Sequence, residues 1–581
     1  MKLHLPIAML AVFASSVACA TMRPETIVNV AAGETLEVSA EDITKKQSQY
    51  SSKNTYELIG VFTKDGQGTL TVSESYNVPQ SLNVREGEMI IGNGTDGERV
   101  EIKAQPYLSD SPTISIGGNN ASLVLDNASY KYNVFDSTGK KSYVSAVAIG
   151  NTDGAGSLTL KGGSELYTSQ SFFAYTVTCQ GHVQDSYAGT TGDALYSNGV
   201  KGQSKLNILE GSKVQAGMTF YFADIDILVD GEGSSFEDGA RNISNYGGWL
   251  GDVDGSGSTD VVTNVTISNG GTWTSRNDLT TSATTTATTN ITVTGKGSTF
   301  NSLRNTNLGD ANQNATTNLT VENGAVANLT DVQVGCASGS ETVNIRITDA
   351  TMNIGSMTVN QGGTVTNDGT ITVADLAKTT SWRDDSTMGL SGGYAANTEA
   401  VAAEFVVGGK VVNNGIIAAG SAAETPVISL IEGGSFTAGE GSKMIGLDAT
   451  GGEFIAAGDF TFTGNVSMSN VDFIFANGVE IDLSGCDFTF TGGSITITLP
   501  DAVAMAYAAE ADASQFGLVF KNAGTVSGLV GQEVTVQDAA GNTTTYTLTQ
   551  DDVVVQAVPE PATATLSLLA LAALAARRRR A

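Results

Sequence analysis

A strand motif that recurs at nearly constant spacing is the feature that most constrains the fold of this chain. Short cores with apolar first and third residues begin at Val265, Ile291, Leu319 and Ile345, so they lie 26, 28 and 26 residues apart. Glycine or another small residue follows each core. Periods of about 20 to 30 residues, built from short strands and Gly or Asn turns, are typical of β-solenoids. Less regularly spaced copies precede them: Leu158–Leu160, Leu206–Ile208 and Ile227–Val229.

One such repeat cannot bury its apolar side alone. Repeats stacked about 4.8 Å apart build a continuous core and satisfy one another's backbone hydrogen bonds. The sequence therefore predicts an all-β chain that forms an elongated parallel β-solenoid. Asparagines beside the strands suit turn positions in the left-handed conformation, and stacked asparagines can form side-chain ladders. A string of antiparallel sandwiches is the alternative, which the scarcity of regular two-residue hairpin turns disfavours.

Changes in composition and strand pattern along the chain indicate where segments begin and end. Residues 21–148 read as an N-terminal β region that starts the solenoid, and residues 149–459 as the repetitive solenoid itself. Inside it, residues 377–402 are polar and predict a loop. Residues 460–557 are richer in aromatic strands and predict a C-terminal β module that caps the last edge. An Ala-rich stretch, 501–511, is compatible with a short helix.

Charge and cysteine usage exclude several functions. Asp and Glu outnumber Lys and Arg by 60 to 30, for a formal charge of −30, so no nucleic-acid partner is expected. Besides Cys19, the chain has Cys179, Cys336 and Cys486, each more than 100 residues from the next. No Cys-x-x-Cys pair is present, so a zinc site is not expected. One long-range disulfide and three buried thiols both remain open.

The N-terminus has the pattern of a secretory signal peptide over residues 1–20. Lys2 supplies the positive start, an apolar stretch follows over 5–17, and Ala18 and Ala20 form a small-x-small site for signal peptidase. The alternative is a lipidated Cys19, which Ser16 disfavours because lipoprotein sites usually carry leucine there. The sequence therefore predicts an exported protein.

The C-terminus, residues 558–581, combines three parts. Val558, Pro559, Glu560 and Pro561 break the preceding strand, because proline fixes φ and removes a backbone donor. An apolar run over 562–576 favours a short hydrophobic helix. It is shorter than the roughly 20 residues of a full membrane span, so only transient inner-membrane contact is expected. A basic stop ends the tail: Arg577, Arg578, Arg579 and Arg580.

This order of parts resembles the PEP-CTERM sorting signal of bacterial exported proteins. The resemblance implies processing by an exosortase-type membrane protease and delivery to the cell envelope or outer surface, or secretion. The glycines and alternating strands over about 149–431 resemble the passenger-type repeats of autotransporter adhesins. That resemblance implies an adhesin-like role, with extracellular polysaccharide or a host glycan as the partner.

One segment has the spacing of a calcium loop. Asp252, Asp254, Ser256 and Asp260 match positions 1, 3, 5 and 9 of an EF-hand loop. Thr263 stands where a bidentate acid is required, and no helix is expected on either side. A solvated repeat turn is therefore the alternative, and no cofactor is expected.

Catalytic signals are sparse. His182 is the only histidine after the signal peptide, so Ser-His or Cys-His chemistry has a single candidate base. The adjacent acids Asp384–Asp385 and Asp551–Asp552 would point to opposite faces of a strand. The tract 280–289 is rich in Thr and Ala and predicts a loop or a water-ordering row. We expect a non-enzymatic structural or adhesive protein. The alternative is a secreted β-helix enzyme acting on polysaccharide, as a lyase or glycoside hydrolase.

Overall fold

The computed structural model describes residues 25–43, 46–50, 55–59, 61–77, 81–94, 97–103, 113–130, 146–150, 154–168, 171–174, 203–216, 219–222, 224–238, 248–251, 262–281, 287–309, 314–336, 341–383, 394–421, 425–499 and 518–557. Two compact units divide the chain. Unit 1 comprises residues 1–403 and 420–423, and unit 2 comprises 404–419 and 424–581. Each is an all-β assembly of parallel strands, as the repeats predict.

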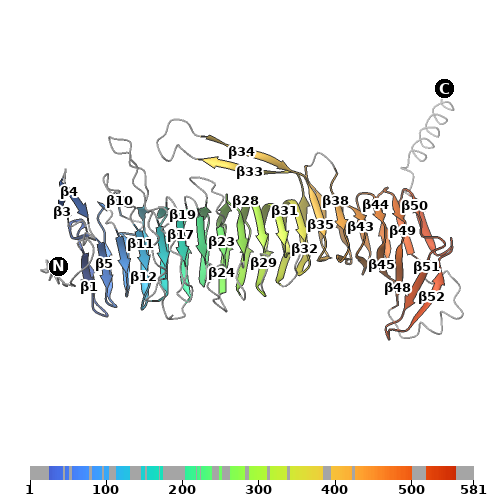
Figure 1. The fold of residues 1–581 in the computed structure, drawn as a ribbon, viewed down its shortest axis with the longest axis horizontal. Coiled ribbons are helices and arrows are strands. Elements are labelled where there is room, and N and C mark those ends of the chain that lie inside the picture. Colours follow the sequence, from blue (N-terminus) through green and yellow to red (C-terminus); the bar gives the residue numbers. More distant parts are fainter. Residues whose placement is uncertain are drawn as a thin grey trace, which may run out of the picture. The chain divides into compact units, whose positions relative to one another are not determined.

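Unit 1 is a solenoid whose coils pass through three faces, and strands on one face pair in parallel (Figure 1). The first face contains β1 (Glu25–Asn29), β5 (Val61–Asp65), β8 (Ser81–Val84), β11 (Thr113–Ile116), β14 (Ala146–Ile149), β17 (Ser171–Ala174), β20 (Thr219–Phe222), β23 (Gly248–Leu250) and β26 (Leu279–Thr281). The second contains β2 (Thr35–Glu37), β6 (Thr69–Val72), β9 (Glu88–Gly92), β12 (Ala121–Asp126), β15 (Gly156–Lys161), β18 (Ser204–Ile208), β21 (Ile225–Asp230), β24 (Val262–Ser268), β27 (Thr288–Thr294) and β29 (Thr316–Glu322). The third contains β7 (Tyr76–Asn77), β10 (Val100–Lys103), β13 (Ala128–Tyr130), β16 (Glu165–Thr168), β19 (Lys213–Ala216), β22 (Ser235–Asp238) and β25 (Thr272–Ser275).

Four longer strands bend around corners and so belong to more than one face. They are β28 (Thr299–Leu308), β30 (Val326–Val334), β31 (Thr342–Val359) and β32 (Gly363–Val373). Outside the faces, the described residues of unit 1 form one helical turn and two antiparallel hairpins: α1 (Ala40–Ile43), β3 (Lys46–Tyr50) with β4 (Thr55–Ile59), and β33 (Leu376–Arg383) with β34 (Tyr394–Val401).

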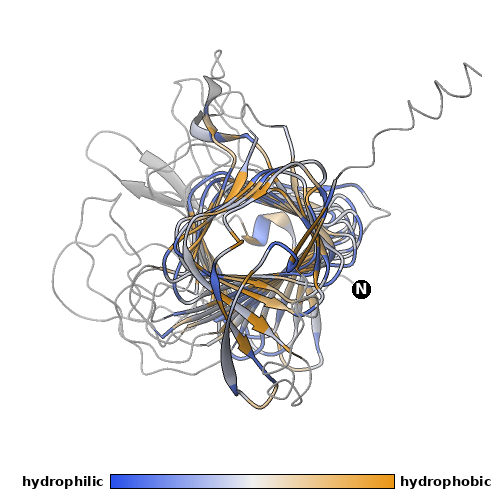
Figure 2. Cartoon of the chain, turned by 90° about the vertical axis from the view of Figure 1, so that its right-hand side faces the viewer, coloured by the Kyte–Doolittle hydropathy of each residue, from blue (hydrophilic) through white to orange (hydrophobic). Residues whose placement is uncertain are grey.

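The sequence repeat corresponds to one coil. Val265, Ile291, Leu319 and Ile345 are direct register partners on the second face. All four are at most 2% exposed, and they continue an inward column that runs back through Leu158 to Leu70. Strand alternation directs every second side chain into this core, and Figure 2 shows the strands end-on around that interior. The expected left-handed turn asparagines are present, with φ of 51° at Asn269 and 56° at Asn323.

Unit 2 repeats the three-face plan with shorter coils. Its first face contains β35 (Glu404–Val407), β38 (Val427–Leu430), β41 (Gly446–Ala449), β44 (Val466–Met468), β47 (Phe488–Phe490) and β50 (Val526–Ser527). The second contains β36 (Lys410–Asn413), β39 (Ser435–Ala438), β42 (Glu453–Ala456), β45 (Val471–Ala476), β48 (Gly493–Thr498) and β51 (Glu533–Gln537). The third contains β37 (Ile416–Ala419), β40 (Ser442–Met444), β43 (Phe460–Phe462), β46 (Glu480–Asp482), β49 (Leu518–Ala523) and β53 (Val553–Ala557). The core of unit 2 is aromatic: the rings of Phe436 and Phe454 stack with centroids 5.7 Å apart.

The aromatic C-terminal stretch continues the parallel coils of unit 2. The antiparallel exception in this stretch is β52 (Thr543–Thr547), which pairs with β51. Two expected loops are partly strands. The segment 377–402 contributes to the β33–β34 hairpin, which forms because Leu376, Val401 and Lys378 attach its base to the coils. The Thr-rich tract 280–289 contributes to β26 and β27, because its threonines occupy strand positions in register with neighbouring coils.

Candidate functional site

The predicted site residues lie mostly outside the described part of the chain. These are Ala18 and Ala20, the sorting residues from Val558 to Arg580, the calcium-loop residues Asp252, Asp254, Ser256 and Asp260, and also Cys179, His182 and Asp384–Asp385. Within the described ranges, no cluster of three or more His, Cys, Asp or Glu is placed to hold a metal ion. No described helix is long and apolar enough to cross a bilayer.

Strand β53 joins the folded body to the C-terminal tail. It pairs in parallel with β49 from Val553, opposite Leu518, to Ala557, opposite Ala523. The buried carboxylate of Asp552 fixes the turn before it. That carboxylate accepts hydrogen bonds from Tyr546 Oη at 3.0 Å and from the Thr549 amide and hydroxyl at 2.6 and 2.7 Å. The pairing of β53 with β49 therefore extends to Ala557.

Asp551 and Asp552 do not form a carboxylate pair. Asp551 is exposed, whereas Asp552 is buried under its three hydrogen bonds. They lie in a turn and not in a strand, so the expectation of opposite strand faces is not tested by them. Of the described cysteines, Cys336 and Cys486 both have intermediate exposure.

An asparagine ladder runs along the second face of unit 1. Asn290 Nδ2 donates to Asn264 Oδ1, Asn318 to Asn290 and Asn344 to Asn318, each at 2.9 Å. The ladder ends on Asp226, whose Oδ1 accepts from Asn264 Nδ2 at 2.8 Å. A carboxylate has only acceptors, so it can close a row of donors that all point the same way.

A second ladder follows the third face. Asn328 Nδ2 donates to Asn301 Oδ1 and Asn353 to Asn328, both at 2.8 Å, and Asn301 donates to Thr274 Oγ1 at 3.2 Å. Each amide hydrogen bond contributes about 0.5–1.5 kcal/mol. The two rows therefore tie successive coils together on the outside, as the aliphatic column does on the inside.

We call the outward side chains of β24, β27, β29 and the first part of β31 the ladder face. They are Val262, Asn264, Thr266 and Ser268; Thr288, Asn290, Thr292 and Thr294; Thr316, Asn318, Thr320 and Glu322; and Thr342, Asn344, Arg346 and Thr348. Only Glu322 and Arg346 carry charge, although the whole chain has a formal charge of −30. The ladder face is therefore a nearly neutral array of hydroxyl and amide groups.

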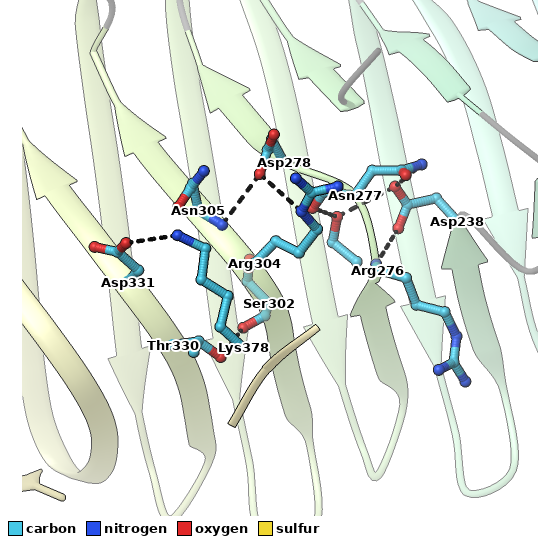
Figure 3. A network of polar contacts seen from close by, with 11 residues as sticks. Asp238, Arg276, Asn277, Asp278, Ser302, Arg304, Asn305, Thr330, Asp331 and Lys378 are labelled. Atoms are coloured by element: carbon cyan, nitrogen blue, oxygen red, sulfur yellow. Dashed lines mark hydrogen bonds and ion pairs between the residues drawn. The ribbon is translucent and has the colours of Figure 1, made fainter. Parts of the chain in front are cut away.

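Charged side chains gather instead at the corner between the third and first faces of unit 1 (Figure 3). Arg304 Nε lies 3.2 Å from Asp278 Oδ1, and the Asn305 amide donates to the same oxygen at 3.3 Å. Farther along, Lys378 Nζ lies 3.0 Å from Asp331 Oδ2. Charges of opposite sign alternate along this row, so the carboxylates are neutralised by neighbouring cations.

Asp238 is the fully buried acid of this corner. Its oxygens accept hydrogen bonds from the Arg276 amide at 3.0 Å, Ser275 Oγ at 3.2 Å and Asn277 Nδ2 at 3.4 Å. Burial raises the pKa of Asp238 to about 7, although these three hydrogen bonds act in the opposite direction. The group has no solvent-exposed surface.

Lys378 also holds the β33–β34 hairpin against the coils. It belongs to β33, whereas Asp331 belongs to β30 of the solenoid. Leu376 and Val401, at the base of the hairpin, lie over Gly355, where an added Cβ would come 3.3 Å from each. The sequence did not predict this corner, because its charges are far apart in the chain and lack a common motif. A bulge in β28 between Ser302 and Asn305 brings Arg304 to it.

The comparison with protein families identifies the tail. A family described as the PEP-CTERM protein-sorting motif matches residues 557–580. Among curated proteins none matches this chain, and none of the solved structures does either. The chain thus carries a PEP-CTERM sorting signal, which indicates an exported, cell-envelope-associated protein that exosortase-type machinery sorts.

Proposed function

We propose that this protein is a non-enzymatic structural or adhesive component of the bacterial cell envelope or surface, whose ladder face binds uncharged extracellular polysaccharide. The sorting signal supports the location. The ladder face supports the role, and it is the observation on which the proposal rests. It presents hydroxyl and amide groups with two charges among sixteen outward positions.

The spacing of the ladder face suits a polymer with repeated hydroxyl groups. Equivalent side chains recur about 4.8 Å apart between coils and about 6.8 Å apart along a strand. The asparagine amides already bond to one another, so the threonine hydroxyls of neighbouring columns are the groups offered to a ligand. Hydrogen bonds from these hydroxyls to a sugar replace similar hydrogen bonds to water, so we expect weak affinity at each site. Simultaneous binding of many sugar units along the ladder face should raise the overall affinity.

Support for a non-enzymatic role comes from the charged corner. Asp278 and Asp331 each contact a cation, and Asp238 is enclosed by hydrogen-bond donors. A glycoside hydrolase needs two carboxyl groups that face one substrate across a cleft. The acids of this corner have other partners, so we assign the protein no catalytic residue.

The location is tested by the intact mass and the cell fraction of the mature protein in its own host. We expect a product that begins near Thr21, lacks the tail and lies outside the inner membrane. Deletion of residues 558–581 should prevent sorting and change that distribution. Retention of the full tail in a protein that stays in the inner membrane would contradict the assignment.

The role is tested by cosedimentation of the mature protein with the extracellular polysaccharide of the same host. Thr292→Glu with Thr320→Glu places two charges on the ladder face and should weaken binding several-fold, since each desolvated charge opposes a neutral ligand. Thr299→Glu with Thr351→Glu is the matched control, because both threonines point outward from the third face. Equal binding by both variants would contradict the assignment of the ladder face.

A further inference from the structure

The sorting motif begins inside the last strand of the folded body. The matched residues start at 557, and Ala557 is the final residue of β53, still paired with Ala523 of β49. No spacer therefore separates the motif from unit 2. Any enzyme that processes the tail near its Pro-Glu-Pro sequence must work within a few residues of β53.

One edge of β53, the open edge, has no partner strand in the part of the chain that the structure describes. Within the described residues β53 pairs with β49 alone. The Leu518 amide donates to the Asp552 carbonyl at 3.1 Å, so Asp552 turns its carbonyl toward β49. Backbone groups alternate in direction along a strand. Val554 therefore also bonds toward β49, whereas Val553 and Val555 direct their N–H and C=O groups to the open edge.

The same strand exposes apolar side chains. Val554 and Val555 are 40% and 43% exposed, and they are neighbours in sequence. Val553, by contrast, is 4% exposed and holds the start of the strand in the core. An open strand edge with exposed apolar residues is a ready template for another strand. Extended peptides commonly bind their partners by adding to such an edge.

We propose that the open edge of β53, with Val554 and Val555, is a docking strand for the exosortase-type protease that processes the tail. The protease would pair one of its own strands with β53 while β53 stays on β49. The folded last coil would thus be part of what the protease recognises, in addition to the motif. This inference rests on the proposed sorting by that machinery, and the continuity of β53 with the motif favours the protease over other occupants.

The test measures how fast the tail is lost in the native host, by pulse labelling and intact mass. Val555→Pro removes an N–H from the open edge and leaves the bonds to β49 in place. Val554→Lys adds a charge beside the edge, a substitution that discourages strand pairing. We expect each to slow processing about threefold to tenfold, where tenfold corresponds to about 1.4 kcal/mol. Val530→Lys is the control, because Val530 is 49% exposed in the same unit; it should leave the rate unchanged.

A disulfide lock separates docking from detachment of the strand. Val519 and Val554 are register partners, and neighbouring strands lie at a separation that a disulfide can span. Val519→Cys with Val554→Cys should be processed at the same rate in its oxidised and its reduced form, since docking needs β53 in place. If the lock stops processing and reduction restores it, β53 must peel away and the inference is wrong.

Three further results would overturn the inference. Normal processing of Val555→Pro and Val554→Lys, in a host that processes the unaltered protein, refutes docking at β53 but leaves sorting intact. If the unaltered protein itself keeps its tail, the proposed sorting fails as well. Dimers of the mature protein that Val555→Pro abolishes would assign the edge to a second copy. Protease resistance of each variant's body confirms that it folds.

Discussion

The buried carboxyl of Asp238 should make unit 1 less stable as pH rises from about 4 to about 7. Its pKa is about 7 in the folded protein and 3.8 as the reference value for an unfolded chain. The folded state therefore binds the proton more tightly than the unfolded state. The stabilisation is complete below pH 4 and is lost as pH rises through the folded pKa.

The size of this loss of stability follows from the same two pKa values. A difference of about three pKa units corresponds to about 4 kcal/mol of unfolding free energy, at about 1.36 kcal/mol per unit. Asp238→Asn carries a neutral amide in place of the protonated acid. We expect this variant to resemble the unaltered protein at pH 4 and to lack the Asp238 contribution to the pH dependence above it.

The assay is urea unfolding from pH 4 to pH 8, followed by the fluorescence of Trp273. Trp273 is buried and its ring centroid lies 4.3 Å from that of Phe236, two residues from Asp238. The other two tryptophans are replaced by phenylalanine so that the signal is local. Glu232→Gln, at an exposed turn of the same coil, controls for loss of one negative charge. The reasoning is refuted if Asp238→Asn and the unaltered protein lose stability equally between pH 4 and pH 7.

Three other changes test the coils. Asn318→Ala removes two ladder hydrogen bonds and should cost about 1–3 kcal/mol of unfolding free energy in urea, whereas Thr320→Ala on the same strand should cost less than half as much. Gly92→Ala should prevent normal folding, because φ is +134° and a Cβ would lie 1.7 Å from a backbone oxygen; the loss would be measured as lost protease resistance. Gly33→Ala is the control and should have a milder effect, because φ is +80° and the space around its Cβ is open. Lys378→Met should leave global stability within about 1 kcal/mol but speed proteolytic cleavage of the hairpin, and an unchanged cleavage rate would show that the ion pair does not hold it.

The repeats predicted the coil because one position recurs with little variation. From Val265 to Ile345, each spacing between successive strand cores equals the number of residues between register partners. Apolar alternation and turn glycines therefore identify both the residues of one face and the length of one coil. The sequence also predicted that stacked asparagines can form ladders, for the same reason. Asn290 and Asn318 occupy equivalent positions in consecutive repeats.

The charged corner was not foreseeable, because it depends on the bulge that places Arg304 beside Asp278 and on a hairpin that returns Lys378 to Asp331. Neither event leaves a periodic signal. The hairpin itself lacks apolar alternation, since its strands build no core of their own. The open edge of β53 was also invisible in the sequence, where Val553–Val555 read as one more strand. Only pairing shows which neighbours a strand has.

Every side-chain amide of the ladder on the second face donates to the coil that precedes it in the chain, from Asn344 back to Asp226. An inserted coil that carries asparagine at this position finds an acceptor below it and offers a new acceptor above. A gene duplication of one whole repeat therefore lengthens unit 1 by one step of about 4.8 Å without disturbing the columns. Insertions of any other length must loop out at a corner. The reach of such a protein can thus evolve in whole coils, while its loops vary independently.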